Sequence, residues 1–417
     1  MKTIKTFDER FREPGSWWIA LGFVVLLGIV LRIAIVSGDI GKLEDPDNYL
    51  KLARSLFDGR GFSLKGRPTA YRPPLYPIVL APLVGGLGTH LPLGIATLHV
   101  LIGGATIVAT GWTGRRWRMS HHASLAAAFV VAADPVLVSQ ARMVMTETFA
   151  AFLVVATLLV STLPGLRGAM FGGMGFGLAS LCRPSLLPAA FLAAFASVML
   201  GPGSRRTRLG RGAILAVVTL ATLSPWAWRN ARIFGEPVWT TTHGGYTLAL
   251  ANNPVYYDDV LNGPPGTVWS GPNQRDWFVK TNQFVAGLGE IEADRRLRGA
   301  ALAMIKDRPV DFCRASMSRL SRFWAIAPAG AVYSSKLRWI TTLWTLPLWI
   351  FLIRGTLRKE SWSWPQIMAA IFILTLTGVH LFYWTDLRMR APIVPAIALV
   401  AALGLPQNRK ASSDKLG

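Results

Sequence analysis

Apolar residues in this chain gather into ten runs, separated by shorter polar or basic segments. The runs contain mainly Leu, Val, Ile, Ala and Phe, and several approach the length of about 20 residues that a helix needs to cross a bilayer. They cover residues 17–36, 93–112, 123–138, 147–163, 170–181, 185–200, 213–228, 339–353, 367–383 and 391–405. This pattern predicts an all-α polytopic membrane protein, a bundle of about ten transmembrane helices.

Basic residues indicate how these helices are oriented. The first run follows a basic tail and lacks the small-residue cleavage site of a secretory signal, so we predict a retained signal anchor with a cytoplasmic N-terminus. Alternating the later runs from there places four basic clusters in the cytoplasm, as the positive-inside rule requires. The clusters begin at Arg115, Arg205, Arg354 and Arg409. We therefore expect a multi-pass protein of the cell membrane with both termini in the cytoplasm.

One apolar segment, residues 75–91, does not form a simple span because proline and glycine interrupt it. Counting it as a span would move the cluster at Arg115 to the outside, so we interpret it as a re-entrant or interfacial piece. Residues 37–92 then form one extracytoplasmic loop. The expected division of the chain is a membrane module at 1–228, a large extracytoplasmic loop region at 229–338, and C-terminal helices with a tail at 339–417.

Composition agrees with a membrane location. Hydrophobic side chains make up 52% of the 417 residues and charged ones only 16%, which is more apolar surface than a soluble core buries. The formal charge of +22 resides in clusters between the apolar runs, so it indicates membrane topology and no nucleic-acid partner. Cys182 and Cys313 form no metal motif. A disulfide between them stays open, although two unrelated buried thiols are the preferred interpretation.

Acidic residues are concentrated where the chain leaves the first apolar run. Glu44, Asp45 and Asp47 follow it within a short segment. A carboxylate held beside a membrane wall is partly desolvated, and it can serve as a general base toward an acceptor hydroxyl or as a ligand for a hard divalent cation. A solvated acidic turn explains these residues equally well.

Charged residues at the outer ends of the predicted helices are further candidates, because charge near the membrane interior is costly. Glu147 begins an otherwise apolar helix on the same side as Asp45, where capping of the helix N-terminus is the alternative. Arginines at this level are suited to hold phosphate oxygens in a bidentate manner, with snorkelling toward lipid headgroups as the alternative. They are Arg183, Arg229, Arg388 and Arg390.

The first loop continues with an amphipathic segment from Tyr49 and a proline-rich return that contains Arg72 and Tyr76. Further motifs follow in order along the chain: Met145-Thr146-Glu147-Thr148, Arg183-Pro184, Pro225-Trp226-Ala227-Trp228-Arg229-Asn230, Gly244-Gly245-Tyr246 with Asn252-Asn253-Pro254, and Arg388-Met389-Arg390-Ala391-Pro392. This series resembles the GT-C glycosyltransferases, in the branch of bacterial relatives of dolichyl-phosphate-mannose protein mannosyltransferases and aminoarabinose transferases.

The resemblance implies a site on the outer face. It implies that Asp45 and Glu147 are catalytic and are the candidate ligands of a divalent metal ion. The chain departs from the pattern at Pro46 and Asp47, where relatives often carry a second acid directly after the first, and this leaves the metal-binding role open. The implied substrate contacts are Asp47, Tyr49, Arg72, Tyr76, Arg183, Arg229, Tyr246, Asn253, Arg388 and Arg390. For Tyr246 and Asn253, a role as ordinary turn residues is the stronger interpretation.

We therefore expect a membrane glycosyltransferase that transfers a sugar from a polyprenyl-phosphate carrier to a hydroxyl of a protein, lipid or glycan, with inversion. The sequence contains no phosphate-cradling loop of the P-loop kind, so no nucleotide cofactor is expected. Two alternatives stay open: a lipid-linked sugar transporter or flippase, and a non-catalytic protein that binds lipid-linked sugar. A transporter would carry ionisable or broken-helix features near mid-membrane, whereas the charged candidates here cluster at one face.

Overall fold

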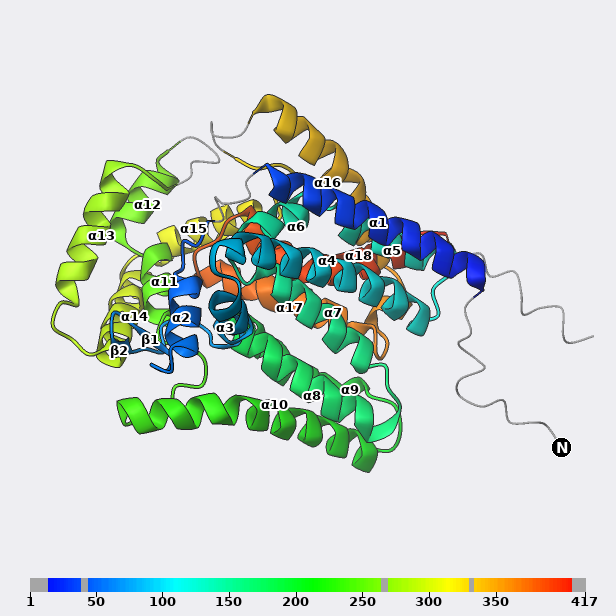
Figure 1. Ribbon diagram of the computed structural model, residues 1–417, viewed down its shortest axis with the longest axis horizontal. Coiled ribbons are helices and arrows are strands. Elements are labelled where there is room, and N and C mark those ends of the chain that lie inside the picture. Colours follow the sequence, from blue (N-terminus) through cyan, green and yellow to red (C-terminus); the bar gives the residue numbers. More distant parts are fainter. Residues whose placement is uncertain (1–13, 39–43, 264–268, 330–333, 407–417) are drawn as a thin grey trace, which may run out of the picture.

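The computed structural model describes residues 14–38, 44–263, 269–329 and 334–406, and within these ranges the fold is almost entirely helical (Figure 1). The strands described are β1 (Ser63–Leu64) and β2 (Arg67–Pro68), which pair antiparallel. The longer or more apolar helices are α1 (Gly15–Ser37), α4 (Leu91–Arg116), α5 (His121–Ala133), α7 (Glu147–Val160), α8 (Gly165–Cys182), α9 (Leu187–Leu200), α10 (Arg205–Phe234), α16 (Ser335–Thr356), α17 (Ile367–Phe382) and α18 (Val394–Leu403). The other helices are α2 (Tyr49–Phe57), α3 (Leu75–Gly86), α6 (Pro135–Ser139), α11 (Gly244–Ala251), α12 (Pro254–Leu261), α13 (Pro272–Phe284), α14 (Glu290–Asp307), α15 (Pro309–Phe323) and the 3-10 segment η6 (Leu387–Ile393).

Fewer of these helices are long enough to cross a bilayer than the sequence predicts. In the described ranges, the helices at Gly15–Ser37, Gly88–Arg116 and Arg205–Phe234 are long and apolar enough, and a bent pair at His121–Ala133 and Pro135–Arg142 can make a fourth span. Other predicted spans are shorter apolar helices, such as Ile367–Phe382. The all-α membrane architecture is confirmed, but the predicted number of spans is not.

The predicted run at 123–138 is broken at Asp134. The helices on either side of this residue are bent by 41°. Proline disfavours helical geometry in the residue before it, and Asp134 adopts an extended ψ of 118° before Pro135. Its Oδ1 atom accepts a hydrogen bond from the backbone N–H of Leu137 at 2.9 Å, so Asp134 caps α6. The aspartate and the proline together explain the bend.

α10 is longer at both ends than the predicted run at 213–228. Ser204 caps its start by accepting a hydrogen bond from the backbone N–H of Thr207, and the basic cluster at Arg205 forms the first turns of the helix. The helix ends before Gly235, whose φ of 81° is the left-handed conformation typical of a helix C-terminus. Arg229 is therefore a helical residue.

Most buried apolar side chains belong to one core that includes residues of α1, α4, α5, α7, α8, α9, α17 and α18. Many of them are alanines that allow helices to approach closely, including Ala151, Ala193 and Ala398. α1 in contrast exposes large apolar side chains such as Phe23 and Leu26. Because an exposed apolar face of this extent is unfavourable in water, it is expected to contact lipid.

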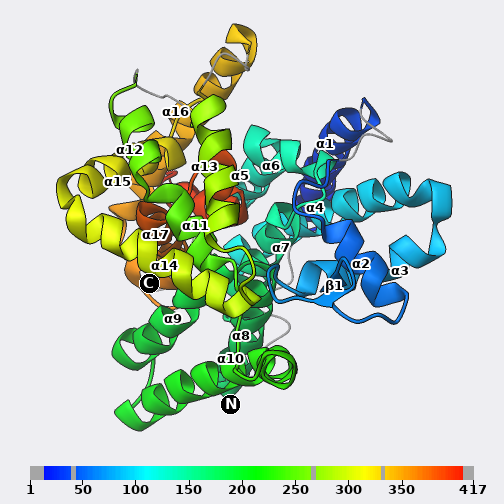
Figure 2. The same ribbon diagram turned by 90° about the vertical axis from the view of Figure 1, so that its left-hand side faces the viewer.

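The two loop regions lie at the same end of the molecule (Figures 1 and 2). The first contains α2, the hairpin and α3, which has 12 residues and a length of about 18 Å, well short of a bilayer of about 30 Å. The second contains α11 to α15 around a core that includes Tyr256 and Trp269. Glu290 joins the two regions, because its carboxylate accepts hydrogen bonds from the Thr69 hydroxyl and the Ala70 backbone N–H, both at 2.7 Å.

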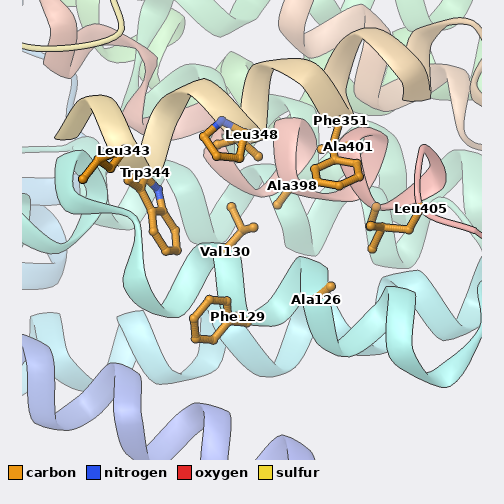
Figure 3. Close-up of a pocket in the computed structure, with 12 residues that line it drawn as sticks. Ala126, Phe129, Val130, Leu343, Trp344, Leu348, Phe351, Ala398, Ala401 and Leu405 are labelled. Carbon is orange, nitrogen blue, oxygen red and sulfur yellow. The ribbon is translucent and has the colours of Figure 1, made fainter. Parts of the chain in front are cut away.

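An apolar groove of about 270 Å³ lies between α5, α16 and α18 (Figure 3). Phe129 and Val130 line one side, and Trp344 and Leu348 line the other. Among the lining side chains only Trp344 carries a polar atom, and its indole N–H donates to Oδ2 of Asp134 at 3.3 Å. This lining suits a hydrocarbon chain and offers no group to a sugar or a phosphate. The groove is therefore not a candidate for the chemistry.

Some predictions fall on residues outside the described ranges. They concern the basic tail in residues 1–13 and the cluster at Arg409, so the location of both termini stays a prediction. The domain boundaries at 228 and 338 likewise stay predictions. Cys182 and Cys313 are both free thiols, which confirms that they are unrelated. Cys182 is buried as expected, but the expectation of a buried thiol is wrong for Cys313, which is exposed.

Gly355 in α16 provides a test of the bundle packing. A Cβ atom at this position would lie 1.9 Å from the carbonyl oxygen of Val400 in α18, so Gly355→Ala must push the two helices apart. We expect the free energy of unfolding, measured in detergent, to fall by about 1–3 kcal/mol. Gly378→Ala in α17 is the matched control, because a Cβ there meets no atom within 4 Å. Equal losses in both variants would contradict the close packing of α16 on α18.

Candidate active site

The chain beyond α1 is held against the segment that precedes α7. The backbone N–H of Val144 donates to the carbonyl oxygen of Glu44 at 2.9 Å. Asp45 follows Glu44 and caps the N-terminus of α2. Its Oδ1 and Oδ2 atoms accept hydrogen bonds from the backbone N–H groups of Tyr49 and Leu50 at 2.8 and 2.9 Å. The first N–H groups of a helix have no partner within the helix, so an acid at this position is stabilising. These bonds orient both carboxylate oxygens of Asp45.

The surroundings of Asp45 change its acidity. Burial raises the pKa of Asp45 above its ordinary value, and the hydrogen bonds from the two backbone N–H groups partly offset this rise. The charge of Asp47 adds to the rise, whereas the charge of Lys51 opposes it. A carboxylate with a raised pKa takes up a proton more readily than an ordinary aspartate does, and this property suits a general base.

Glu147 and Arg183 form a buried ion pair. The Glu147 side chain is 1% exposed, and its Oε1 atom lies 3.1 Å from Nη1 of Arg183. Arg183 follows the last residue of α8 and is extended because a proline comes next, which confirms the predicted break at this position. Neither oxygen of Glu147 accepts a hydrogen bond of good geometry from any described residue. The carboxylate is therefore paired in charge, but its two buried oxygens accept no hydrogen bond from a described residue.

η6 brings a second carboxylate–arginine pair to the same place. Nε of Arg388 donates to Oδ2 of Asp386 at 3.2 Å, and Nη2 of Arg183 lies 2.7 Å from Sδ of Met389. Burial by itself lowers the pKa of Arg388, but neighbouring carboxylates raise it above its ordinary value. These carboxylates belong to Asp386, Glu147 and Asp47. The Arg388 guanidinium thus lies near acids of η6, α7 and the first loop region.

Asp47 and Arg72 form the third pair. Nη2 of Arg72 donates to Oδ1 of Asp47 at 2.7 Å, and the two side chains are 17% and 23% exposed respectively. Burial raises the pKa of the neighbouring Tyr49, and several charges act on the same hydroxyl. They include those of Asp47, Arg72 and Glu147. Three carboxylate–arginine pairs from distant parts of the chain are therefore close enough for their charges to act on the same groups, Arg388 and Tyr49.

Tyr49 and Tyr76 lie behind this centre. Their ring centroids are 5.3 Å apart, and both side chains are buried. The Tyr76 hydroxyl lies 2.7 Å from Nε2 of His99, and Nδ1 of His99 lies 2.9 Å from the carbonyl oxygen of Ala141. Because that carbonyl only accepts, Nδ1 carries the proton and Nε2 accepts from Tyr76. These two predicted substrate contacts thus serve as internal supports of the site.

Three aromatic side chains lie beside the Asp47–Arg72 pair. The ring centroids of Tyr71 and His243 are 4.3 Å apart, and those of His243 and Tyr246 are 5.2 Å apart. The Arg72 guanidinium lies 5.2 Å from the centroid of the Tyr71 ring. Burial lowers the pKa of His243 well below its ordinary value and the charge of Arg72 acts in the same direction, so this imidazole is neutral at physiological pH.

Three predicted substrate contacts are engaged in bonds that join elements of the fold. Arg229 donates to the carbonyl oxygen of Thr69 at 2.8 Å, and Arg390 donates to that of Ala325 at 2.7 Å. Asn253 accepts a hydrogen bond from a backbone N–H of α12 and caps that helix, as the turn interpretation expects. We therefore do not include these residues in the site.

Asp386 is a site residue that the sequence analysis missed. It lies two residues before Arg388, and its Oδ1 atom also accepts from the backbone N–H of Arg388 at 2.9 Å. The available signal was an acid two and four residues before the arginines Arg388 and Arg390, in the loop that precedes the last apolar run. That spacing alone does not distinguish a partner of Arg388 from a solvated acid.

The residues present do not fit a resident divalent metal ion. In the part of the chain that the structure describes, no group of three or more His, Cys, Asp or Glu side chains is arranged to hold one. Both oxygens of Asp45 accept backbone N–H groups, and the Arg183 guanidinium lies against Glu147. Because the two predicted ligands are joined by no third His, Cys, Asp or Glu among the described residues, we derive no step through a metal.

Arg183→Met tests the buried pair. This change leaves the Glu147 carboxylate buried without a cation, and we expect it to lower the free energy of unfolding in detergent by about 3–5 kcal/mol. Adding Glu147→Gln should recover part of that loss, because it removes the uncompensated charge. As a control, Arg314→Met breaks the exposed pair with Asp311 and should cost about 1 kcal/mol or less. Similar losses in Arg183→Met and Arg314→Met would argue against a buried pair.

Comparison with known proteins identifies the fold. No family model and no curated protein matches the sequence. The structure of the apo oligosaccharyltransferase from Archaeoglobus fulgidus is similar, with a TM-score of 0.55 and 14% identity over 93% of this chain and 50% of that one. The same protein tethered with an acceptor peptide gives a TM-score of 0.54 and 15% identity over 93% and 49% of the chains. ArnT from Cupriavidus metallidurans bound to undecaprenyl phosphate gives 0.45 and 15% over 94% and 77%. This chain thus spans about half the length of the oligosaccharyltransferase, and it has the GT-C fold.

Proposed function

We propose that this chain is a membrane glycosyltransferase that moves a sugar from a polyprenyl-phosphate carrier to an acceptor hydroxyl on the outer face of the membrane. The observation that carries the proposal is a set of three carboxylate–arginine pairs, connected by the action of the Glu147 and Asp47 charges on Arg388. The GT-C fold adds support, because the solved oligosaccharyltransferase has the same fold. The location of both loop regions at one end of the helices also supports a site that faces one side of the bilayer (Figure 1).

The proposed reaction is a single displacement with inversion. The acceptor oxygen forms a bond to the anomeric carbon while the bond from that carbon to the carrier's phosphate oxygen breaks. The electron pair of the broken bond leaves with the phosphate, and the acceptor's proton passes to a carboxylate of the protein. The carrier phosphate is the leaving group and a carboxylate takes the proton, so the reaction needs no nucleotide cofactor.

Arg388 and Arg183 are proposed to hold the departing phosphate. Their side chains are 29% and 12% exposed, so water screens their charges only partly. A guanidinium presents paired N–H donors to phosphate oxygens, and this interaction strengthens as negative charge develops on the leaving group. Stabilisation of the transition state beyond that of the bound donor lowers the barrier.

Asp45 is proposed as the general base. Its two backbone hydrogen bonds orient the carboxylate, and burial raises its pKa. Each carboxylate oxygen accepts one of these bonds and keeps a second lone pair for the acceptor hydroxyl. Glu147 is proposed to hold the Arg183 guanidinium in place for the phosphate through their ion pair.

The aromatic side chains beside Arg72 are proposed to bind the sugar ring. Tyr71 and Tyr246 are partly exposed, and a pyranose can stack its apolar face on such rings while Asp47 and Arg72 reach its hydroxyls. The acceptor is left as a hydroxyl of a protein, lipid or glycan, because this chain spans about half of the oligosaccharyltransferase that was solved with a peptide.

Comparing two aspartates tests the assignment of the base. In detergent with a polyprenyl-phosphate sugar, Asp45→Asn should lower kcat by about 100-fold or more with a small change in KM, since general-base catalysis contributes about 10²–10⁴. Asp47→Asn should mainly raise KM for the donor, because it breaks the pair with Arg72. Asp58→Asn, in the exposed pair with Arg60, is the control for a charge change in the same loop region. If Asp47→Asn loses kcat while Asp45→Asn keeps full turnover, Asp47 and not Asp45 is the general base.

The acidic limb of the pH profile provides a second test. A base must be deprotonated to act, so kcat/KM should fall as the pH falls through the raised pKa of Asp45. We expect this limb to lie above the ordinary aspartate range and to disappear from the residual activity of Asp45→Asn. A profile that keeps the same limb in Asp45→Asn would contradict the assignment. Donor binding without turnover at any pH would instead indicate a non-catalytic lipid-sugar-binding protein.

A further inference from the structure

A second pocket, of about 450 Å³, lies on the other side of α2. It is bounded by α2, the β-hairpin and the region where α3 is followed by α4. Lys51, Arg54 and Ser55 form its α2 wall, and their spacing of three and four residues places them on one face of the helix. Tyr49 lies on the opposite face and packs against Tyr76 behind the candidate active site. The two sites therefore share one helix but use different faces of it.

The pocket is basic. Four of its lining side chains carry a positive charge, and all four are exposed: Lys51, Arg54, Arg60 and Lys65. Among the described residues, Arg60 pairs with Asp58, the charge of Lys51 acts on Asp45, and no ion pair with an acid is described for Arg54 or Lys65. Cations gathered in a concave site without matching acids attract anions more strongly than the same charges on a flat surface.

The hairpin places one of these cations at the rim. Lys65 and Gly66 form the turn between β1 and β2 with φ values of 52° and 73°, the combination that the twist of a two-residue hairpin favours. The hydroxyls of Ser55 and Ser63 lie 2.6 Å apart and connect α2 to the hairpin. Because the hairpin is bonded to α2, the backbone of Lys65 has a fixed position at the rim of the pocket.

The remaining wall is apolar and belongs to membrane-associated elements. Val84 near the end of α3 is 2% exposed, and Leu91 is the first residue of α4. α4 belongs to a helix that is long and apolar enough to cross a membrane. The pocket thus combines cations with apolar side chains where a candidate span begins, which is the level of lipid headgroups.

We propose that this pocket binds the phosphate-bearing headgroup of a membrane lipid, at a site separate from the one assigned to sugar transfer. Lys51, Arg54 and Lys65 contact the phosphate oxygens, and the half-buried Leu64 and Leu91 contact the hydrocarbon next to the headgroup. A soluble phosphate would use the cations but would leave the apolar wall in water. Since Asp45 closes the start of the same helix, a lipid on this face also holds α2 against the bilayer.

Native mass spectrometry of the full chain in detergent tests the proposal through binding alone. The probes are phosphatidic acid, phosphatidylcholine and inorganic phosphate. We expect phosphatidic acid to bind more tightly than phosphatidylcholine. Arg54→Gln/Lys65→Gln should weaken phosphatidic acid binding about 30-fold, from about 1 kcal/mol for each basic residue near a lipid surface and about 1.4 kcal/mol per tenfold in affinity.

The matched control is Lys280→Gln/Lys306→Gln, which removes the same charge from exposed positions in α13 and α14 and should leave the affinity unchanged. Equal weakening in the control would overturn the proposal, because it would show a general charge effect. Unchanged affinity in Arg54→Gln/Lys65→Gln would overturn it as well. Competition by inorganic phosphate at the affinity of the lipid would overturn the lipid assignment. Because no assay here involves sugar transfer, the result is independent of the proposed function.

Discussion

Burial of the Glu147 carboxylate against the Arg183 guanidinium is the constraint on which the candidate site depends. A carboxylate that is 1% exposed needs an opposite charge at close range, since an uncompensated charge in an apolar bundle is strongly unfavourable. The chain must therefore turn between α8 and α9 at the level where α7 begins. The same arginine contacts Met389, which brings η6 and Arg388 to this level too. One ion pair thus locates three segments that are distant in sequence.

Helix caps and hydrogen bonds between segments then position the two loop regions relative to the Glu147–Arg183 pair. Asp45 closes α2, and Glu290 at the start of α14 accepts from both Thr69 and Ala70 of the first loop region. Arg229 adds a bond from α10 to the carbonyl oxygen of Thr69. The aromatic side chains of the second loop region consequently lie against Arg72 of the first. Rigid support of this kind is what a site needs to hold a sugar in one orientation.

The charged and apolar hollows of the molecule have different chemical characters. The groove between α5, α16 and α18 is lined by hydrocarbon and suits an acyl or prenyl chain, whereas the pocket on α2 combines cations with Val84 and Leu91. α2 separates this basic pocket from the candidate active site.

The sequence by itself determined the helical membrane architecture, the break at Arg183-Pro184 and the candidacy of Asp45, Glu147 and Arg388. These features follow from local properties, namely apolar run length, the geometry of a residue before proline and the cost of charge near lipid. Only the tertiary structure decided which groups the charged side chains pair with. Arg229 and Arg390 donate to backbone carbonyls, and the unpredicted Asp386 pairs with Arg388. A hydrogen bond requires atoms within about 3 Å, and packing between segments far apart in the chain decides which atoms meet at that distance.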